Sequence, residues 1–184
     1  FSTQTLKNST LTVNEFLEIA FSLVDNRVNT QKPISLGFIF ACLLWHKLLK
    51  YWSLNKSRGL KEIPALHDAI NRIIADNFKS FPIQKRHLSD MKEIWILQPR
   101  FEKRRGKAPF RLIKNLKFRV ALNFLKLRAD IKMVDNNLPI WWEKFSTQKE
   151  EERINLINSI TYPASSLNQK KRNRSVGSVG VHTT

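Results

Sequence analysis

The stretch PALHDAINRIIADNF, residues 64–78, carries the clearest structural signal in this chain. Its apolar side chains recur every three or four residues, a spacing that places them along one face of an α-helix. Pro64 lies where the first helical turn should be, and proline is tolerated there because its missing N–H would have no partner in any case. The stretch therefore predicts an amphipathic helix that packs on a hydrophobic core through Leu66, Ala69, Ile70, Ile73, Ile74 and Phe78.

The segments before this helix are predicted to be helical as well. Thr12 and Glu15 have the spacing of a capping box, which opens a helix that should end near residues 29–32. Pro33 then opens the next helix, which is expected to run from about residue 34 to residue 54 without a break. Because this helix is apolar nearly all round at its start, we expect it at the centre of the core.

Downstream of the quoted stretch, the same spacing predicts further helices. They are expected at about 84–98, 110–114, 117–133 and 138–145, with a resumption at 150–160. Pro99 should close the first of these, and a basic loop should follow it. No segment alternates apolar and polar residues over the length of a strand, and glycine and proline together number only twelve in 184 residues. The predicted fold class is therefore all-α, an irregular bundle of about six to seven helices with a disordered basic C-terminal tail.

Composition and charge divide this bundle into parts. The last part lacks apolar periodicity and is rich in Ser, Asn, Lys and Arg, which is typical of disorder. The expected organisation is a helical body at 1–80, an arginine-rich helical module at 81–147, a terminal helix at 148–162 and a disordered basic tail at 163–184.

Positive charge is concentrated in one part of the chain. Fifteen Lys and Arg against three acids lie between Lys79 and Arg128, a net charge of +12 out of +17 for the whole chain. Such a concentration focuses the electrostatic potential and attracts phosphate. Arginine is frequent there, and its planar guanidinium grips phosphate bidentately and stacks on bases. Nucleic acid is the predicted partner, and a solvated lysine-rich helix face is the alternative interpretation.

The residues that carry catalysis in other proteins are scattered here. His46, His67, His87 and His182 are far apart and have no cysteine or acidic partner at metal-ligand spacing. No glycine-rich phosphate loop or nucleophile elbow is present. The acids show no close pair of the kind that holds two metal ions. We therefore predict no catalytic residue, no metal site and no cofactor in this chain.

Cys42, the single cysteine, lies in an apolar run and is expected to be a small buried side chain. One cysteine forms no disulfide framework, which favours a reducing compartment, so we expect a cytoplasmic location. No signal peptide is present, and the longest apolar stretch, residues 34–45, is too short to cross a bilayer. The chain opens at Phe1 without an initiator methionine, so we expect part of a longer protein or a truncated product.

Several collinear segments resemble the C-terminal half of bacterial poly(A) polymerases of the tRNA-nucleotidyltransferase superfamily. They span roughly residues 22 to 146 and are Asp25–Val28, Phe38–Trp45, Ile94–Phe101, Arg104–Lys107, Arg111–Lys114, Phe118–Arg119, Leu125–Ala129 and Trp141–Trp142. The resemblance implies an all-helical body with the arginine-rich C-terminal module of such an enzyme.

The family adds AMP from ATP to RNA 3′ ends, with Mg²⁺ held by acids of an N-terminal nucleotidyltransferase head. That head, with its Gly-Ser motif and paired aspartates, does not match any segment of this sequence. The resemblance therefore implies that ATP and Mg²⁺ belong to the parent enzyme, and that this chain alone holds and guides RNA without being active in polyadenylation.

Charge and resemblance together predict an RNA-binding groove that follows the phosphate backbone of a single-stranded 3′ end. Its expected residues are the cations Arg100, Lys103, Arg104, Arg105, Lys107, Arg111, Lys114, Lys117 and Arg119. Phe101 and Phe110 are candidates for stacking on a base, with a core role as the alternative for each. Gly106 either lets the backbone approach a phosphate or supplies a turn conformation. Because phosphate contacts carry no base information, little sequence preference is expected.

Three other interpretations remain open from the sequence. The chain could be the C-terminal body of a CCA-adding tRNA nucleotidyltransferase, which a preference for tRNA over single-stranded RNA would reveal. It could instead be a non-enzymatic basic helical scaffold for an acidic protein or an anionic membrane, although no helix convincingly combines a basic face with an exposed apolar one. It could also be a truncated reading frame with no independent role.

Overall fold

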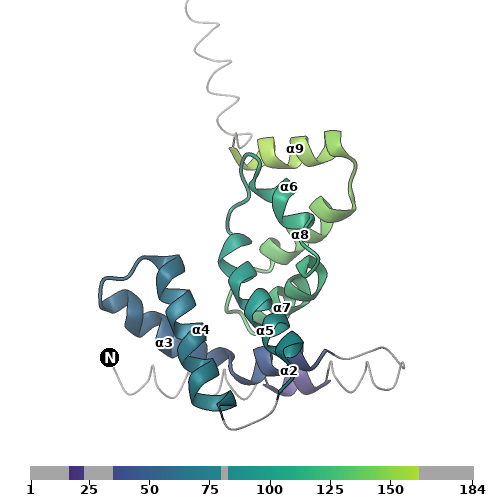
Figure 1. Ribbon diagram of the computed structural model, residues 1–184. Helices are drawn as coiled ribbons and strands as arrows, with labels where there is room; N and C mark the ends of the chain where they lie inside the picture. The colour runs from purple at the N-terminus through teal and green to yellow at the C-terminus, as the bar shows by residue number, and fades with distance from the viewer. Residues whose placement is uncertain (1–16, 23–34, 80–82, 162–184) are drawn as a thin grey trace, which may run out of the picture.

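The computed structural model describes residues 17–22, 35–79 and 83–161, and these ranges are helical with connecting turns and contain no strand (Figure 1). Residues 17–22 are helical, and the elements that follow are α2 (Leu36–Leu43), α3 (Trp45–Ser57), α4 (Glu62–Phe78), α5 (Lys85–Leu97), the 3-10 turn η1 (Gln98–Arg100), α6 (Ala108–Ile113), α7 (Phe118–Asp130), α8 (Asn137–Thr147) and α9 (Glu150–Thr161). The all-α class is confirmed, with more helices than the six to seven expected.

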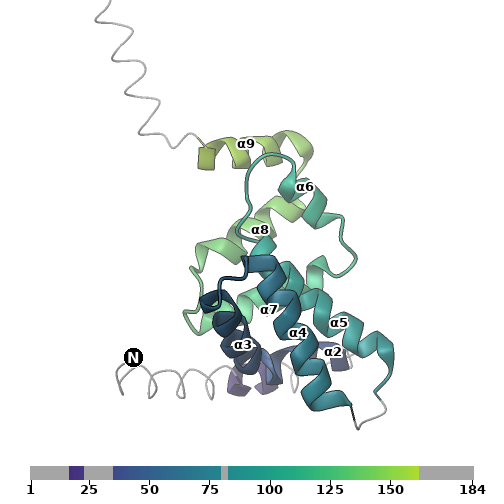
Figure 2. The same ribbon diagram turned by 60° about the vertical axis from the view of Figure 1, so that its left-hand side comes forward.

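The helices form two groups that meet along α5 and α7. In Figure 1, α3 and α4 form a hairpin that stands to one side of α5 and α7, with α2 below. The helices α8, α6 and α9 follow above, and Figure 2 shows the same order from a second direction. The basic segment between η1 and α6 therefore belongs to the upper group.

The first hydrophobic cluster fills the space between α2, α3, α4, α5 and one face of α7. Its largest members without exposed surface are Trp45, Trp95 and Phe124. The rings of Trp45 and Phe124 meet edge to face with centroids 5.1 Å apart. Cys42 belongs to this cluster, and its burial raises the pKa of its thiol to about 12, in agreement with the predicted core role.

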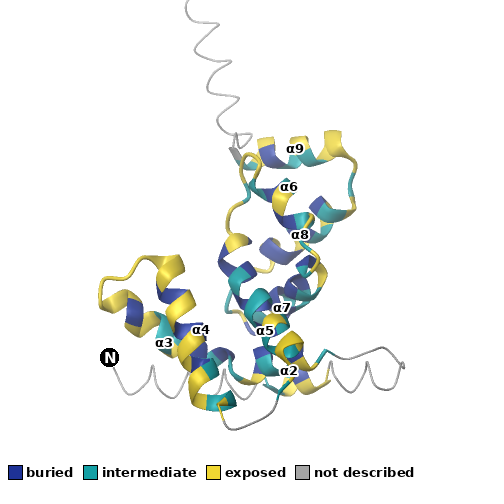
Figure 3. Ribbon diagram, in the orientation of Figure 1, coloured by how far each residue is buried: buried dark blue, intermediate teal, exposed yellow. Residues whose placement is uncertain are grey.

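The second cluster joins the end of α5, Phe101, α6, α8 and α9 to the other face of α7. Phe101, Trp142 and Phe145 have no exposed surface in it. On α7 itself, Phe124 and Leu127 face the first cluster while Leu122 and Leu125 face the second. Figure 3 shows this burial in dark blue along α5 and α7. The helix α7 is therefore a wall shared by both clusters.

The stripe predicted for residues 64–78 is confirmed, and the single helix predicted for residues 34–54 is wrong. In the α4 stripe, Leu66, Ala69, Ile70 and Ile73 are buried, and the remaining two side chains are half-buried. The 34–54 segment is divided at Leu44, whose φ of −101° and ψ of 2° are not helical.

Packing explains the division at Leu44, because α2 lies along α5 while α3 pairs with α4. Gly37 permits the first of these contacts, since a Cβ there would lie 2.5 Å from the Cβ of Asp90 and 2.7 Å from the carbonyl oxygen of His87. Two separate helices can pack along two different partner helices, which one uninterrupted helix could not do.

Other boundaries deviate by a few residues from those expected. The helix predicted at 84–98 is α5, and Pro99 lies in η1 directly after it, as expected for a proline at a helix end. The basic loop ends earlier than predicted because α6 already begins at Ala108. The predicted start of the first helix and the predicted disordered tail lie outside the described residues. Within the described ranges, no helix has the length and apolar character needed to cross a membrane.

Candidate nucleic-acid interface

The basic loop, residues 101–107, connects η1 to α6 and is fixed at its start by a buried aromatic ring. Phe101 has no exposed surface, and its ring centroid lies 5.3 Å from that of Trp142 in an edge-to-face contact. The indole Nε1 of Trp142 donates a hydrogen bond to the carbonyl oxygen of Phe101 at 2.8 Å. The candidate role of Phe101 in base stacking is therefore wrong, because its ring is enclosed by the second cluster and cannot contact RNA.

After Phe101 the chain turns sharply. The Lys103 N–H donates to the carbonyl of Arg100 at 3.0 Å, and the Arg104 N–H donates to that of Glu102 at 3.1 Å. Gly106 has a φ of +58°, in the left-handed region that side chains rarely adopt, and nothing lies within 4 Å of where its Cβ would be. Of the two roles predicted for Gly106, the turn conformation is the one that its backbone requires.

Most of the predicted RNA-contacting cations are exposed. Arg100 ends η1, Lys103, Arg105 and Lys107 lie in the loop, Arg111 and Lys114 lie on and after α6, and Arg119 lies in the first turn of α7. Within the part of the chain that the structure describes, the ion pairs closer than 4.0 Å are Lys117–Asp90 and Lys126–Glu143, so none of these seven cations is paired. Their positive charge is directed at solvent rather than neutralised by the fold.

Two predicted residues have other surroundings. The Nζ of Lys117 lies 2.7 Å from Oδ1 of Asp90 on α5, so this charge is shared with the body of the protein. Arg104 is half-buried, with its guanidinium 5.7 Å from the ring centroid of Trp141. Trp141 is in turn stacked on Phe145, with centroids 4.9 Å apart and an interplanar angle of 12°. Arg104 therefore attaches the loop to α8.

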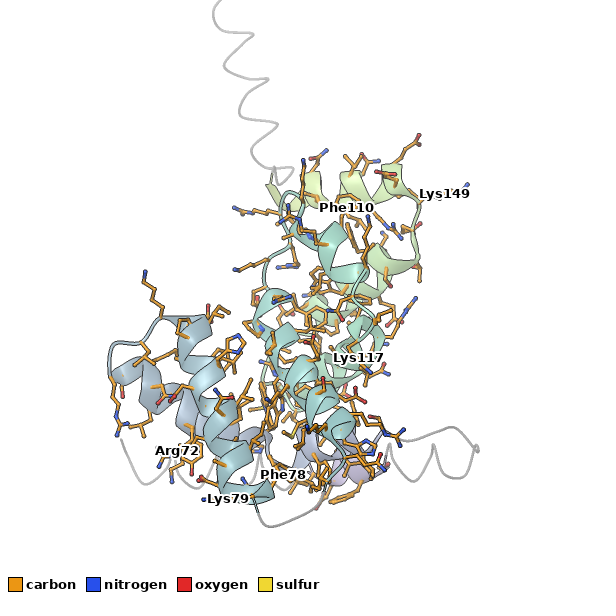
Figure 4. All side chains as sticks on the ribbon, in the orientation of Figure 1. Arg72, Phe78, Lys79, Phe110, Lys117 and Lys149 are labelled. Atoms are coloured by element: carbon orange, nitrogen blue, oxygen red, sulfur yellow. The ribbon has the colours of Figure 1, made fainter. Side chains whose placement is uncertain are left out.

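Phe110, the second candidate for base stacking, is half-buried. Its ring meets that of Phe145 edge to face at 5.3 Å. Figure 4 shows Phe110 close to α6 and α9, and Lys117 lower down beside α5 and α7. The residue is neither fully enclosed nor fully exposed, so both of its predicted roles are compatible with its position.

Arg128 is a half-buried cation that the sequence did not single out. Its Nη1 donates to Oε1 of Gln98 at 3.1 Å, and its guanidinium lies 4.9 Å from the ring centroid of Trp45. Its Nε is enclosed without a hydrogen-bond partner. Burial lowers the pKa of Arg128 to about 10, and the negative charge of Glu102 partly opposes this shift. Its place on α7, four residues after Phe124, is the only signal in the sequence for this burial.

Three of the exposed cations border one hollow between η1 and α6, which we call the η1–α6 pocket. Its volume is about 230 Å³, and its lining residues are Arg100, Lys103, Ala108, Arg111, Leu112 and Asn115. Elsewhere in the described ranges, no three His, Cys, Asp or Glu side chains gather closely enough to hold a metal ion. The charged side chains that line this pocket are therefore all cationic.

Comparison with known proteins gives a consistent result. The family model of the polymerase A arginine-rich C-terminus matches residues 58–176. The poly(A) polymerase I of Salmonella typhi is 30% identical over 142 residues, which cover 74% of this chain and 30% of the relative. That of Haemophilus influenzae is 30% identical over 140 residues, covering 75% and 31%. The Escherichia coli enzyme is 26% identical over 171 residues, covering 91% and 37%.

The chain spans about a third of the length of these relatives. The match with the family model includes the basic loop, the η1–α6 pocket and the helices that support them. The resemblance to the C-terminal module of bacterial poly(A) polymerases is thereby confirmed. The chain belongs to the family of the polymerase A arginine-rich C-terminus.

Proposed function

We propose that this chain binds the single-stranded 3′ end of RNA as the C-terminal part of a bacterial poly(A) polymerase. The observation that carries the proposal is the group of exposed cations on η1, the basic loop and α6, none of which forms an ion pair in the described part of the chain. An unpaired positive surface releases counterions when it meets a phosphate backbone, and this release favours binding.

We assign AMP transfer to the part of the parent enzyme that lies outside the segment matched by this chain. The described residues bring no group of acids together that fits Mg²⁺, so no step through a metal or ATP is derived for this chain. Its contribution is to hold the RNA while the rest of the enzyme acts on the strand end. The relatives compared here carry the name poly(A) polymerase, which supports polyadenylation over CCA addition as the reaction of the parent.

The salt dependence of RNA binding tests this proposal. Each phosphate contact to a single strand contributes about 0.7 to the slope of log K against log salt concentration. Replacing Arg105, Lys107 and Lys114 by glutamine should therefore reduce the slope by about 2 for a fluorescent oligo(A) RNA. Fluorescence anisotropy at several salt concentrations measures this slope directly.

A matched control is provided by the exposed cations Lys50, Arg58 and Lys61, which lie on and beside the α3–α4 hairpin. Replacing these three by glutamine removes the same charge away from the proposed site. If both triple variants reduce the slope equally, binding is a general charge effect and the site is refuted. Competition by unlabelled tRNA and oligo(A) separates the two kinds of parent enzyme, because a CCA-adding enzyme should prefer tRNA.

A further inference from the structure

The η1–α6 pocket is formed by residues that the local structure brings to one place. Ala108, Arg111, Leu112 and Asn115 have the spacing of a single helix face, along α6 and just beyond its end. Arg100 and Lys103 approach this face from the opposite side, where η1 passes into the basic loop. The pocket is therefore built by two consecutive segments of the family module, without any contribution from α2, α3 or α4.

Every polar side chain that lines this pocket offers hydrogen-bond donors. Arg100, Lys103 and Arg111 have no acceptor atom in their cationic groups. Asn115 has one, but its Oδ1 already accepts a hydrogen bond from the Lys117 N–H at 2.7 Å, which leaves Nδ2 as a donor.

Two backbone carbonyls of the lining residues are also engaged in hydrogen bonds. That of Arg100 accepts from the Lys103 N–H at 3.0 Å, and that of Leu112 accepts from the Asn115 N–H at 3.1 Å. A ligand that is rich in acceptors and carries negative charge matches this lining best. The phosphate group fits that description, whereas a nucleobase presents donors and acceptors together.

The volume of the pocket and its apolar lining residues further restrict which ligands fit. A volume of 230 Å³ is roughly eight times the ~30 Å³ share of one water molecule, and lies below the ~300 Å³ at which sites for whole small molecules begin. Ala108 and Leu112 supply apolar surface beside the cations, and Leu112 is 5% exposed. These dimensions suit a phosphate with its attached sugar.

We propose that the η1–α6 pocket seats one phosphodiester of the bound RNA, with the adjoining ribose against Ala108 and Leu112. This inference rests on the proposed function and adds a defined position to it. Exposed cations along a surface let a strand slide, while a pocket that surrounds one phosphate fixes the strand relative to the protein. Binding of RNA thus has a preferred register that does not depend on base sequence.

The side-chain amide of Asn115 is a direct probe of this pocket. In nitrogen-15 NMR spectra of the full chain at constant ionic strength, adding the dinucleotide ApA should shift the Nδ2 signal of Asn115 saturably. Adenosine, which has no phosphate, should leave the signal unchanged. Inorganic phosphate and AMP also carry a phosphate group. Titrations with each of them show whether the pocket binds a free phosphate or nucleotide rather than the phosphodiester of a strand.

The substitution Asn115→Asp tests the donor role without removing the local hydrogen bond. An aspartate can still accept from the Lys117 N–H, but it replaces the Nδ2 donor by a negatively charged acceptor beside the phosphate. We expect it to weaken ApA and oligo(A) binding at least about tenfold. Asn71→Asp, at an exposed position on α4, changes the charge equally and should alter binding much less.

The outcomes separate the two proposals. Unchanged ApA affinity in Asn115→Asp, or an adenosine shift as large as that of ApA, overturns the phosphate seat. Shifts with AMP and inorganic phosphate but none with ApA assign the pocket to a free nucleotide and overturn the strand assignment. Binding of oligo(A) that leaves the Asn115 signal in place refutes the seat alone, while no oligo(A) binding by the wild-type chain refutes the proposed function as well.

Discussion

Arg104 and Arg105 are neighbours in the sequence but have different surroundings. Arg104 is half-buried with its guanidinium over Trp141, which is stacked on Phe145. Arg105 is exposed and forms none of the ion pairs or ring contacts found in the described residues. A cation over an aromatic ring stabilises the fold, whereas a solvated guanidinium is available to a ligand. Arg104 therefore anchors the loop, and Arg105 is exposed for the proposed contact with RNA.

This difference makes a prediction for two single substitutions. Arg104→Ala should lower the free energy of unfolding by about 0.5–1 kcal/mol, because it removes the contact with Trp141. Arg105→Ala should leave stability within about 0.5 kcal/mol of wild type and should reduce the salt slope of RNA binding by about 0.7. Urea denaturation measures the first quantity and anisotropy the second. Equal stability losses in the two variants would contradict the assignment of Arg104 as an anchor.

At the scale of elements, Gln98 connects α5, η1 and α7. It is 2% exposed, and its Nε2 donates to the carbonyls of Ile94 at 2.9 Å and Ala121 at 3.2 Å. Its Oε1 accepts from Arg128 at 3.1 Å. Withdrawing a guanidinium from water is costly, and the amide oxygen of Gln98 is an acceptor that offsets part of this cost for Arg128. Through Gln98, η1 and the start of the basic loop are held to the shared helix α7.

Removing this connection should destabilise the protein. Gln98→Leu should lower the free energy of unfolding by about 1–3 kcal/mol, because the buried carbonyls of Ile94 and Ala121 lose a donor and the Nη1 of Arg128 loses an acceptor. Urea denaturation checks this value. Gln84→Leu, an exposed position before the first turn of α5, is the matched control and should change stability by less than about 0.5 kcal/mol. A loss as small as that of the control would show that Gln98 carries no buried hydrogen bond of consequence.

Periodicity predicted the elements well where one face of a helix is buried. The α4 stripe is an example, and on α7 Ala121 and Leu125 share this helical spacing and are buried. Periodicity did not predict that Phe124 and Leu127 on the other face of α7 are buried too, because it cannot show that a second cluster packs there. Nor does the sequence mark Leu44 as a break, since only the choice of packing partners ends α2 at that point.

The sequence predicted which cations lie in the candidate site, but not the contacts that these residues make. The density of Lys and Arg identified the region around Arg100 and Arg111, whose charges are exposed. The pairing of Lys117 with Asp90, the contact of Arg104 with Trp141 and the enclosure of Phe101 all join residues far apart in the chain. Such contacts depend on how helices pack, and no local pattern encodes them.

For the whole molecule, the shared helix α7 makes the two clusters dependent on each other. Each cluster alone lies on only part of the chain, and both lose packing if α7 moves. The basic loop that carries the proposed RNA contacts begins at Phe101 of the second cluster, while α3 and α4 contribute only to the first. Packing of the α3–α4 hairpin should therefore stabilise the basic loop indirectly, because both depend on α7.

A substitution far from the loop tests this coupling. Ile73→Ala removes a fully buried side chain from α4 and should lower the free energy of unfolding by about 2–5 kcal/mol. The indole N–H signals of Trp95 in the first cluster and Trp142 in the second should then disappear at the same, lower urea concentration, because the domain unfolds in one step. Leu116→Ala, at a side chain that is 98% exposed, should shift neither midpoint. If Trp142 keeps the wild-type midpoint while that of Trp95 falls, α7 does not couple the clusters, and the second cluster with its basic loop unfolds as an independent unit.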